Sequence, residues 1–263
     1  MSLHGMIVKN PPIEVGFFHR VDVGIDPYEG IYEQSAKLQF EHHPKRGHPM
    51  KDFPLFTTEY GIASLVLKEI PYKEEAYITI RSSEQPAELL AECVSFCRIC
   101  GAERVFAAGH ETLEQYPPQT AVLEMRGQCQ INEEKVASLF PVTEQTVTRW
   151  RQICNERMRG VDNAATLESR DEKKILESGG AYFVHEDGDL LGIGWIDQGE
   201  LLVVAAEKPG AGERVMHTLF SMMPGEDLRL QVASTNTKAI RLYEHLGFIK
   251  TKEVSRWYRV FPK

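Results

Sequence analysis

A tyrosine on a capped helix is the first candidate for chemistry in this sequence. Residues 228–232 alternate between apolar and polar, as a half-buried strand does, and a polar break follows at Ser234-Thr235-Asn236. The next apolar residues recur three or four positions apart, on one helical stripe: Ala239, Leu242, Tyr243 and Leu246. Gly247 suits the left-handed position that ends a helix. This pattern predicts a phenol hydroxyl held at a fixed point of a strand–helix unit.

The second candidate is a turn that contains glycine. The apolar strand 201–205 leads into Glu207-Lys208-Pro209-Gly210-Ala211-Gly212, and a helix over 213–223 follows. Glycines let a backbone approach an anion, and the unpaired N–H groups of a first helical turn can bind phosphate oxygens. A P-loop would need Gly-Lys-Ser/Thr, and a Rossmann fingerprint would need glycine in place of Val215. A tight turn without a ligand remains the alternative.

Together, the two patterns resemble the GNAT superfamily of acyl-CoA N-acyltransferases. The sequence Asn236-x-x-Ala239-x-x-Leu242-Tyr243-x-x-Leu246-Gly247-Phe248 is similar to the last strand–helix unit of that family. The Gly210-x-Gly212 turn lies one strand and one helix upstream, where the family has its pyrophosphate loop. The resemblance implies acetyl-CoA as co-substrate and a primary amine, on a small molecule or a protein, as acceptor.

The resemblance also implies roles for individual residues. Tyr243 would lie near the CoA sulfur and protonate the departing thiolate, although alone it would be interpreted as a core aromatic. Asn236 would cap the last helix and reach the pantetheine arm. A backbone N–H between Val203 and Ala205 would hold the thioester carbonyl. The implied binding residues are Leu202, Val203, Val204, Ala205, Lys208, Pro209, Gly210, Ala211, Gly212, Glu213, Asn236 and Tyr243.

Two positions depart from the family pattern. Glu207 stands where the family has Arg or Gln, and its carboxylate would repel a pyrophosphate unless Lys208 or the helix N-terminus offsets it. Gln231 stands where some members place a glutamate, and an amide cannot accept a proton. Glu200, acting through a water, is the best remaining candidate for the base, with Asp197 and His185 as alternatives. A catalytically impaired acyl-CoA-binding or regulatory module is therefore the rival function.

The order of elements supports the same family. From residue 135, the patterns predict strand 136–140, helices 143–159 and 167–178, strands 181–185, 190–195 and 201–205, helix 213–223, strand 228–232, the last helix and strand 255–260. Glu186-Asp187-Gly188-Asp189 predicts a hairpin turn. This order resembles the GNAT fold, an α/β (α+β) class built on a mixed sheet.

The first half is expected to be a degenerate GNAT-like unit, which makes the chain a tandem. Its predicted elements are strands 62–67 and 77–80, helix 84–99, and strands 104–107 and 120–125. A pair of glycines is missing after Arg81, so a phosphate loop is not expected there. We expect domains at 1–130 and 131–263, with the first shaping either the acceptor site or the interface of a homodimer.

Composition limits the other possibilities. The chain has 263 residues and a net charge of -8, which argues against nucleic acid as a partner. An apolar run of about 20 residues, as a membrane span needs, is missing, and residues 1–10 lack the pattern of a signal peptide. The 5 cysteines are an odd number, typical of reduced thiols. We expect a cytoplasmic protein.

Two cysteine and histidine clusters could suggest a metal. Cys93, Cys97 and Cys100 have the spacing of an iron–sulfur motif, but they fall on one stripe of a predicted helix, as buried cysteines do. His42, His43 and His48 crowd a segment rich in proline and glycine, which favours an exposed loop. We expect no metal.

Overall fold

The computed structural model describes residues 55–262 of the chain. The first half contains β1 (Leu55–Thr58), β2 (Gly61–Val66), α1 (Ile70–Lys73), β3 (Glu75–Ser83), α2 (Pro86–Ile99), β4 (Arg104–Ala108), the 3-10 turn η1 (Glu111–Gln115) and β5 (Pro118–Gln128). The second half contains η2 (Glu133–Lys135), β6 (Ser138–Pro141), α3 (Val147–Met158), α4 (Asp171–Ser178), β7 (Ala181–Glu186), β8 (Asp189–Asp197), β9 (Glu200–Ala206), α5 (Gly212–Phe220), β10 (Asp227–Ala233), α6 (Thr237–His245) and β11 (Ile249–Phe261).

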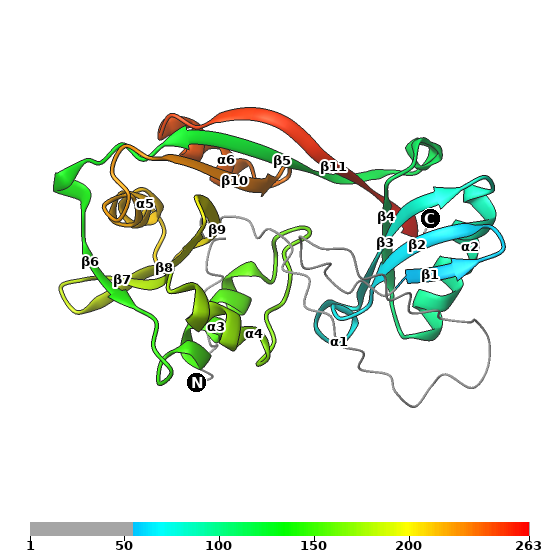
Figure 1. The fold of residues 1–263 in the computed structure, drawn as a ribbon, viewed down its shortest axis with the longest axis horizontal. Helices are drawn as coiled ribbons and strands as arrows, with labels where there is room; N and C mark the ends of the chain where they lie inside the picture. The colour runs from blue at the N-terminus through cyan, green and yellow to red at the C-terminus, as the bar shows by residue number, and fades with distance from the viewer. Residues whose placement is uncertain (1–54, 263) are drawn as a thin grey trace, which may run out of the picture.

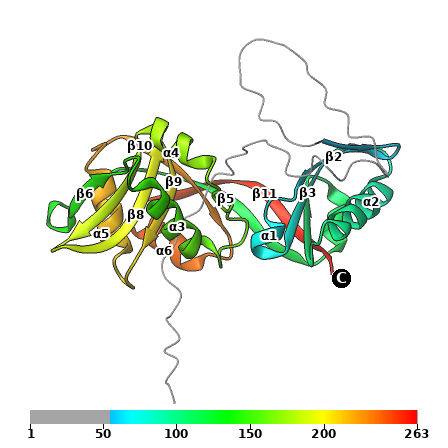
Figure 2. The ribbon, with the colours of Figure 1, turned by 90° about the horizontal axis from the view of Figure 1, so that it is seen from below.

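The described strands form one mixed sheet in the order β1-β2-β3-β4-β11-β5-β10-β9-β8-β7-β6. Figures 1 and 2 show that the sheet curls into two lobes, with α2 against the first and α3 to α6 around the second. The predicted α/β mixed sheet is therefore confirmed. Within residues 55–262, none of the helices combines the length and apolarity that crossing a bilayer requires.

The two halves repeat one order of elements. Apart from the short helix α1 between β2 and β3, the series β1-β2-β3-α2-β4-η1-β5 matches β7-β8-β9-α5-β10-α6-β11, with the short turn η1 in the place of α6. In each series the third and fourth strands are parallel, β3 with β4 and β9 with β10. This repeat is the tandem arrangement that the sequence predicts.

The last strand of each half pairs with the other half. β10 lies beside β5 along Asp227–Ala233, and the end of β11 pairs with β4 at Tyr258–Phe261. The two exchanged strands also pair with each other, and Figure 1 shows them crossing between the lobes. Each lobe thus completes its sheet with a strand from the other, so the boundary expected at residue 130 does not separate the sheet.

Helix α5 packs closely on the sheet because two glycines lie beneath it. A Cβ atom on Gly192 would come within 2.8 Å of Val215 Cγ2, and one on Gly194 within 2.6 Å of Leu219 Cδ2. Val215, Leu219 and Phe220 are fully buried in the core beneath α5 and α6. The glycines therefore fix the height of α5 and the place of its N-terminus at the end of β9.

Most predicted elements are present, and three begin four or more residues from the predicted start. The hairpin turn is confirmed, with positive φ at Asp187 (51°) and Gly188 (85°). Helix α3 begins at Val147, because residues 144–146 form a turn first, and α4 begins at Asp171 after a loop over 159–170. β11 begins at Ile249, six residues before the predicted strand, and residues 249–254 are exposed. Pairing with β5, rather than apolar alternation, makes that segment a strand.

Candidate active site

The parallel strands β9 and β10 separate soon after they meet. Within the described chain they pair only at Glu200 with Arg229 and at Leu201 with Leu230. Beyond that point β9 remains paired with β8, and β10 with β5, so the two strands diverge toward their carboxyl ends. Backbone polar groups that face the divergence lack a strand partner there, and a ligand can satisfy them.

A β-bulge lies where the strands part. Trp195 pairs with Val203 and Ile196 with Leu201, so Leu202 is the extra residue. The N–H of Glu207 donates to the carbonyl of Leu191 at 2.7 Å, which directs the backbone of Glu207 toward β8. Backbone groups alternate along an antiparallel pair, so we expect the N–H of Val204 to face the divergence. It lies inside the predicted range 203–205 for a carbonyl-binding N–H.

The first half lacks an equivalent opening. β3 and β4 stay paired from Glu75 with Arg104 to Thr79 with Ala108. A Cβ atom on Gly109 would lie 2.5 Å from the carbonyl oxygen of Ile80, so the chain closes tightly beyond the pair. Residues 84–85 alone connect β3 to α2. Within residues 55–262, the second half therefore holds the candidate site.

The turn after β9 brings the predicted phosphate-binding residues to the N-terminus of α5. Gly210 has φ of 82°, a conformation that favours glycine, and a Cβ atom there would have no neighbour within 4 Å. Ala211 is the N-cap residue and Gly212 the first residue of the helix. Lys208 is exposed and pairs with Asp189 at 2.5 Å. The Glu213 side chain accepts from Lys135 at 2.6 Å, which lowers the pKa of Glu213.

Glu207 has a cationic partner that the sequence did not reveal. Arg157, near the end of α3, donates from Nε to Glu207 Oε2 at 3.1 Å and from Nη2 to Oε1. The fork neutralises the carboxylate that the sequence predicts to be repulsive. The sequence signal that could have pointed to Arg157 was helical spacing, since Arg157 lies one turn after Ile153, a buried residue of α3.

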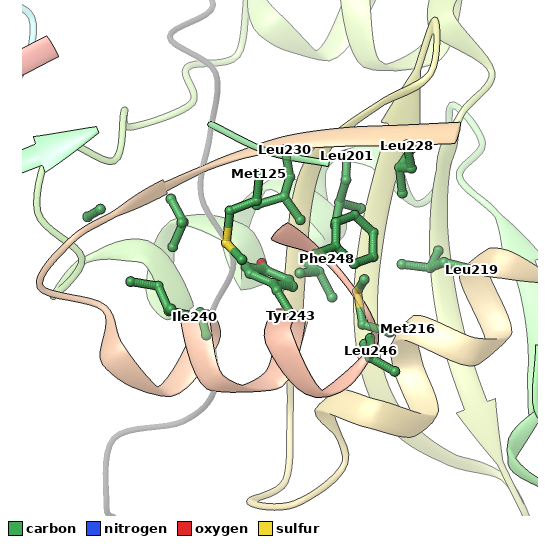
Figure 3. Close-up of a cluster of buried hydrophobic side chains, with 14 of the residues drawn as sticks. Met125, Leu201, Met216, Leu219, Leu228, Leu230, Ile240, Tyr243, Leu246 and Phe248 are labelled. Atoms are coloured by element: carbon green, nitrogen blue, oxygen red, sulfur yellow. The ribbon is translucent and has the colours of Figure 1, made fainter. Parts of the chain in front are cut away.

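Helix α6 carries the other two motif residues. The side-chain oxygen of Asn236 accepts from the N–H of Ala239 at 3.2 Å and caps the helix. Gly247, with φ of 87°, follows its last turn. Tyr243 is 1% exposed, and its ring centroid lies 6.1 Å from that of Phe248. Figure 3 shows its ring beside Met125 and Phe248, in the core between α6 and the sheet.

Not all of the candidate general bases lie near the point where β9 and β10 diverge. Glu200 lies one residue before β9 and β10 separate, and its Oε2 accepts from Arg229 Nε at 3.1 Å. Asp197 is its cross-strand partner on β8. His185 lies on β7, which β8 and β9 separate from β10, and its ring contacts the rings of Phe140 and Phe183.

Two carboxylates that the sequence analysis missed lie near β10. Glu124 on β5 is the cross-strand partner of Gln231, and hydrogen bonds, first from Arg126, lower its pKa. Asp162, in the loop after α3, accepts from the hydroxyl of Thr235 at 2.7 Å, next to the cap of α6. Both are brought there by pairings between distant segments, which leave no local sequence signal.

The cysteines of α2 behave as apolar residues. Cys93 and Cys97 are fully buried in the core of the first lobe. Burial raises the pKa of the Cys93 thiol to about 12 and raises that of Cys97 as well, so both stay protonated at neutral pH. The histidines at 42, 43 and 48 lie outside the described residues.

Known proteins resemble this chain in structure and not in sequence. Neither a protein-family profile nor a curated protein matches the sequence. The GCN5-related N-acetyltransferase from Anabaena variabilis has a TM-score of 0.50 at 8% identity, covering 79% of this chain and 62% of that one. This likeness shows that the chain has the fold of the GCN5-related N-acetyltransferases, which confirms the resemblance at the level of the fold.

Two further structures are similar. A GCN5-related N-acetyltransferase from Sphaerobacter thermophilus has a TM-score of 0.43 at 14% identity and covers 76% of this chain and 77% of that one. A tandem GNAT protein from the clavulanic acid biosynthesis pathway has a TM-score of 0.46 at 13% identity and covers 78% and 80%.

Proposed function

We propose that the protein is an acyl-CoA-dependent N-acyltransferase that transfers acetyl from acetyl-CoA directly to a primary amine. The observation that carries the proposal is the divergence of β9 and β10 directly before the Gly210–Gly212 turn, in a chain with the GNAT fold. The unpaired backbone edge of a parallel strand, next to a helix N-terminus, suits a ligand with a narrow, extended chain that ends in an anionic group.

The binding residues divide between the two ends of acetyl-CoA. The amides of residues 210–213 and the positive end of α5 would bind the pyrophosphate. The pantetheine arm would lie along the open edge of β9 toward the bulge at Leu202, with Asn236 beside it. The N–H of Val204 would donate to the thioester carbonyl and stabilise the oxyanion as it forms.

The chemistry needs two proton transfers. The neutral amine attacks the acyl carbon, its nitrogen then loses a proton to the base, and the C–S bond breaks as the tetrahedral intermediate collapses and the departing thiolate takes up a proton. We assign proton donation to the thiolate to Tyr243. Glu200 remains the candidate base, acting through a water, because Arg229 holds its carboxylate at the point where the strands part.

Calorimetry with acetyl-CoA and CoA, followed by a thiol-release assay, tests the proposal. The amine panel would include an amino acid, a polyamine, an aminoglycoside and a peptide with a free N-terminus. Micromolar binding together with amine-dependent thiol release is the expected result. Lack of binding to either nucleotide would overturn the proposal.

The second candidate is a catalytically impaired acyl-CoA-binding module. Gln231 cannot act as a base, Glu200 is already paired with Arg229, and Tyr243 is deep in the core. Tight acetyl-CoA binding without thiol release for any amine would favour this alternative.

A further inference from the structure

The end of α3 and the turn after β9 are joined by the ion pair of Arg157 and Glu207. We propose that Arg157 is the cation that lets this turn accept the pyrophosphate of CoA, in place of the basic or amide residue missing from the turn itself. This inference rests on the proposed function. The two residues are 50 positions apart: Glu207 lies in the turn, and Arg157 approaches it from α3, which packs on β8 and β9.

The pair of Arg157 and Glu207 is more buried than the pair of Lys208 and Asp189 at the same turn. Its side chains are 18% and 33% exposed. Lys208 and Asp189 are 54% and 69% exposed, so water and salt screen them strongly. A charge left unpaired at Glu207 would therefore act on a nearby phosphate more strongly than one left at Asp189.

The geometry of the guanidinium leaves a nitrogen for a ligand. Arg157 uses Nε and Nη2 on Glu207, and Nη1 makes no hydrogen bond within residues 55–262. The planar fork binds one anion while it presents a further N–H edge to a second. Glu207 thus orients Arg157, and Arg157 cancels the charge of Glu207, so an incoming pyrophosphate meets a donor instead of a bare carboxylate.

The electrostatic argument predicts a specific pattern of coupling. Arg157→Gln leaves Glu207 as an unpaired carboxylate beside the ligand and removes the Nη1 donor. Glu207→Gln in the same chain removes the repulsion again. The double variant should therefore bind CoA more tightly than Arg157→Gln alone, although each change deletes a charged group.

The experiment measures dissociation constants of CoA and of pantetheine, which lacks the pyrophosphate, by calorimetry. For Arg157→Gln we expect about tenfold weaker CoA binding, the loss typical of a charged hydrogen bond, with pantetheine unchanged. Arg157→Lys, which keeps the charge without the fork, should lie between. Arg151→Gln is the matched control, because Arg151 lies on the same helix at 17% exposure and pairs with Glu172 of α4.

The possible outcomes distinguish a failure of this inference from a failure of the proposed function. If the unmodified protein does not bind CoA, the proposed function fails. If it binds CoA and Arg157→Gln binds equally well, or loses CoA and pantetheine to the same extent, the inference alone fails. Should Arg157→Gln not fold, Arg157→Lys and the double variant decide, because neither leaves an unpaired carboxylate at position 207. Weaker binding of CoA, with pantetheine unchanged, would support the inference, and CoA binding equal to that of the unmodified protein in both variants would overturn it.

Discussion

Glu69 and Thr166 lie 97 residues apart in different halves, and the Glu69 carboxylate accepts both the N–H and the hydroxyl of Thr166, at 2.9 and 2.7 Å. Beside them, Lys73 donates to the carbonyl of Ala164 at 2.5 Å. The first half thereby holds the loop between α3 and α4. The same loop carries Asp162, which binds Thr235 at the start of α6.

Replacing Thr166 with valine should destabilise the protein. The change preserves shape but removes a hydrogen bond to a buried carboxylate, because Glu69 is 2% exposed. We expect a loss of about 1.5–3 kcal/mol in the free energy of unfolding, measured with urea. Ser169→Ala, on the exposed part of the same loop, should change it by less than about 0.5 kcal/mol. Equal effects of the two changes would contradict this role for Thr166.

Stability should depend on pH through Lys73. Burial lowers the pKa of Lys73 from its ordinary 10.5. At pH values below the folded-state pKa, the lysine is protonated in both states and the cost of burying its charge is fully present. As pH rises through the folded-state pKa toward 10.5, the native state loses its proton first and that cost disappears.

The measurement compares the unfolding free energy of the unmodified protein with that of Lys73→Met from pH 7 upward. The difference should move in favour of the unmodified protein as pH approaches about 10. Lys173→Met is the control for the loss of a lysine side chain, because that lysine is 82% exposed. A flat difference for Lys73→Met would count against a buried ammonium.

Helix α5 should respond to a single added methyl group. Gly194→Ala would place a carbon within 2.6 Å of Leu219 Cδ2 and force the helix away from the sheet. We expect a loss of about 1–3 kcal/mol in unfolding free energy and weaker CoA binding, because α5 carries the phosphate-binding turn. Gly160→Ala is the control, since a Cβ atom there would meet nothing within 4 Å. Unaltered stability in Gly194→Ala would mean that α5 is not fixed by this contact.

Sequence patterns predict the helices and strands of this fold better than they predict which strands pair with each other. Alternation locates the strand β10 and helical spacing locates the helix α6, because these patterns report which face of a segment is buried. They do not report which strand lies alongside, so the exchange of β5 and β11 was not predictable. For the same reason the motifs locate Gly210 and Tyr243, whereas the partnership of Arg157 with Glu207 depends on how α3 lies over β9.

The exchange of strands predicts that the halves depend on each other. A fragment of residues 1–130 lacks β11, which β4 pairs with, and a fragment of 131–263 lacks β5, which β10 pairs with. We expect each fragment alone to lack a cooperative unfolding transition, and the two to copurify and fold when expressed together. Circular dichroism and gel filtration provide the measurement. A cooperative transition in either isolated fragment would show that the exchange is dispensable.

Tyr243→Phe distinguishes a catalytic hydroxyl from a core aromatic. The ring is 1% exposed and packed against Phe248, so phenylalanine keeps the packing and removes only the hydroxyl. If Tyr243 protonates the departing thiolate, turnover should fall about 100-fold while the dissociation constant of CoA stays nearly unchanged. Phe248→Leu is the control, because it disturbs the same cluster without touching the hydroxyl and should lower stability more than turnover. Unchanged turnover in Tyr243→Phe would leave the residue as part of the core, and would direct the search for the acid to other groups along the divergence of β9 and β10.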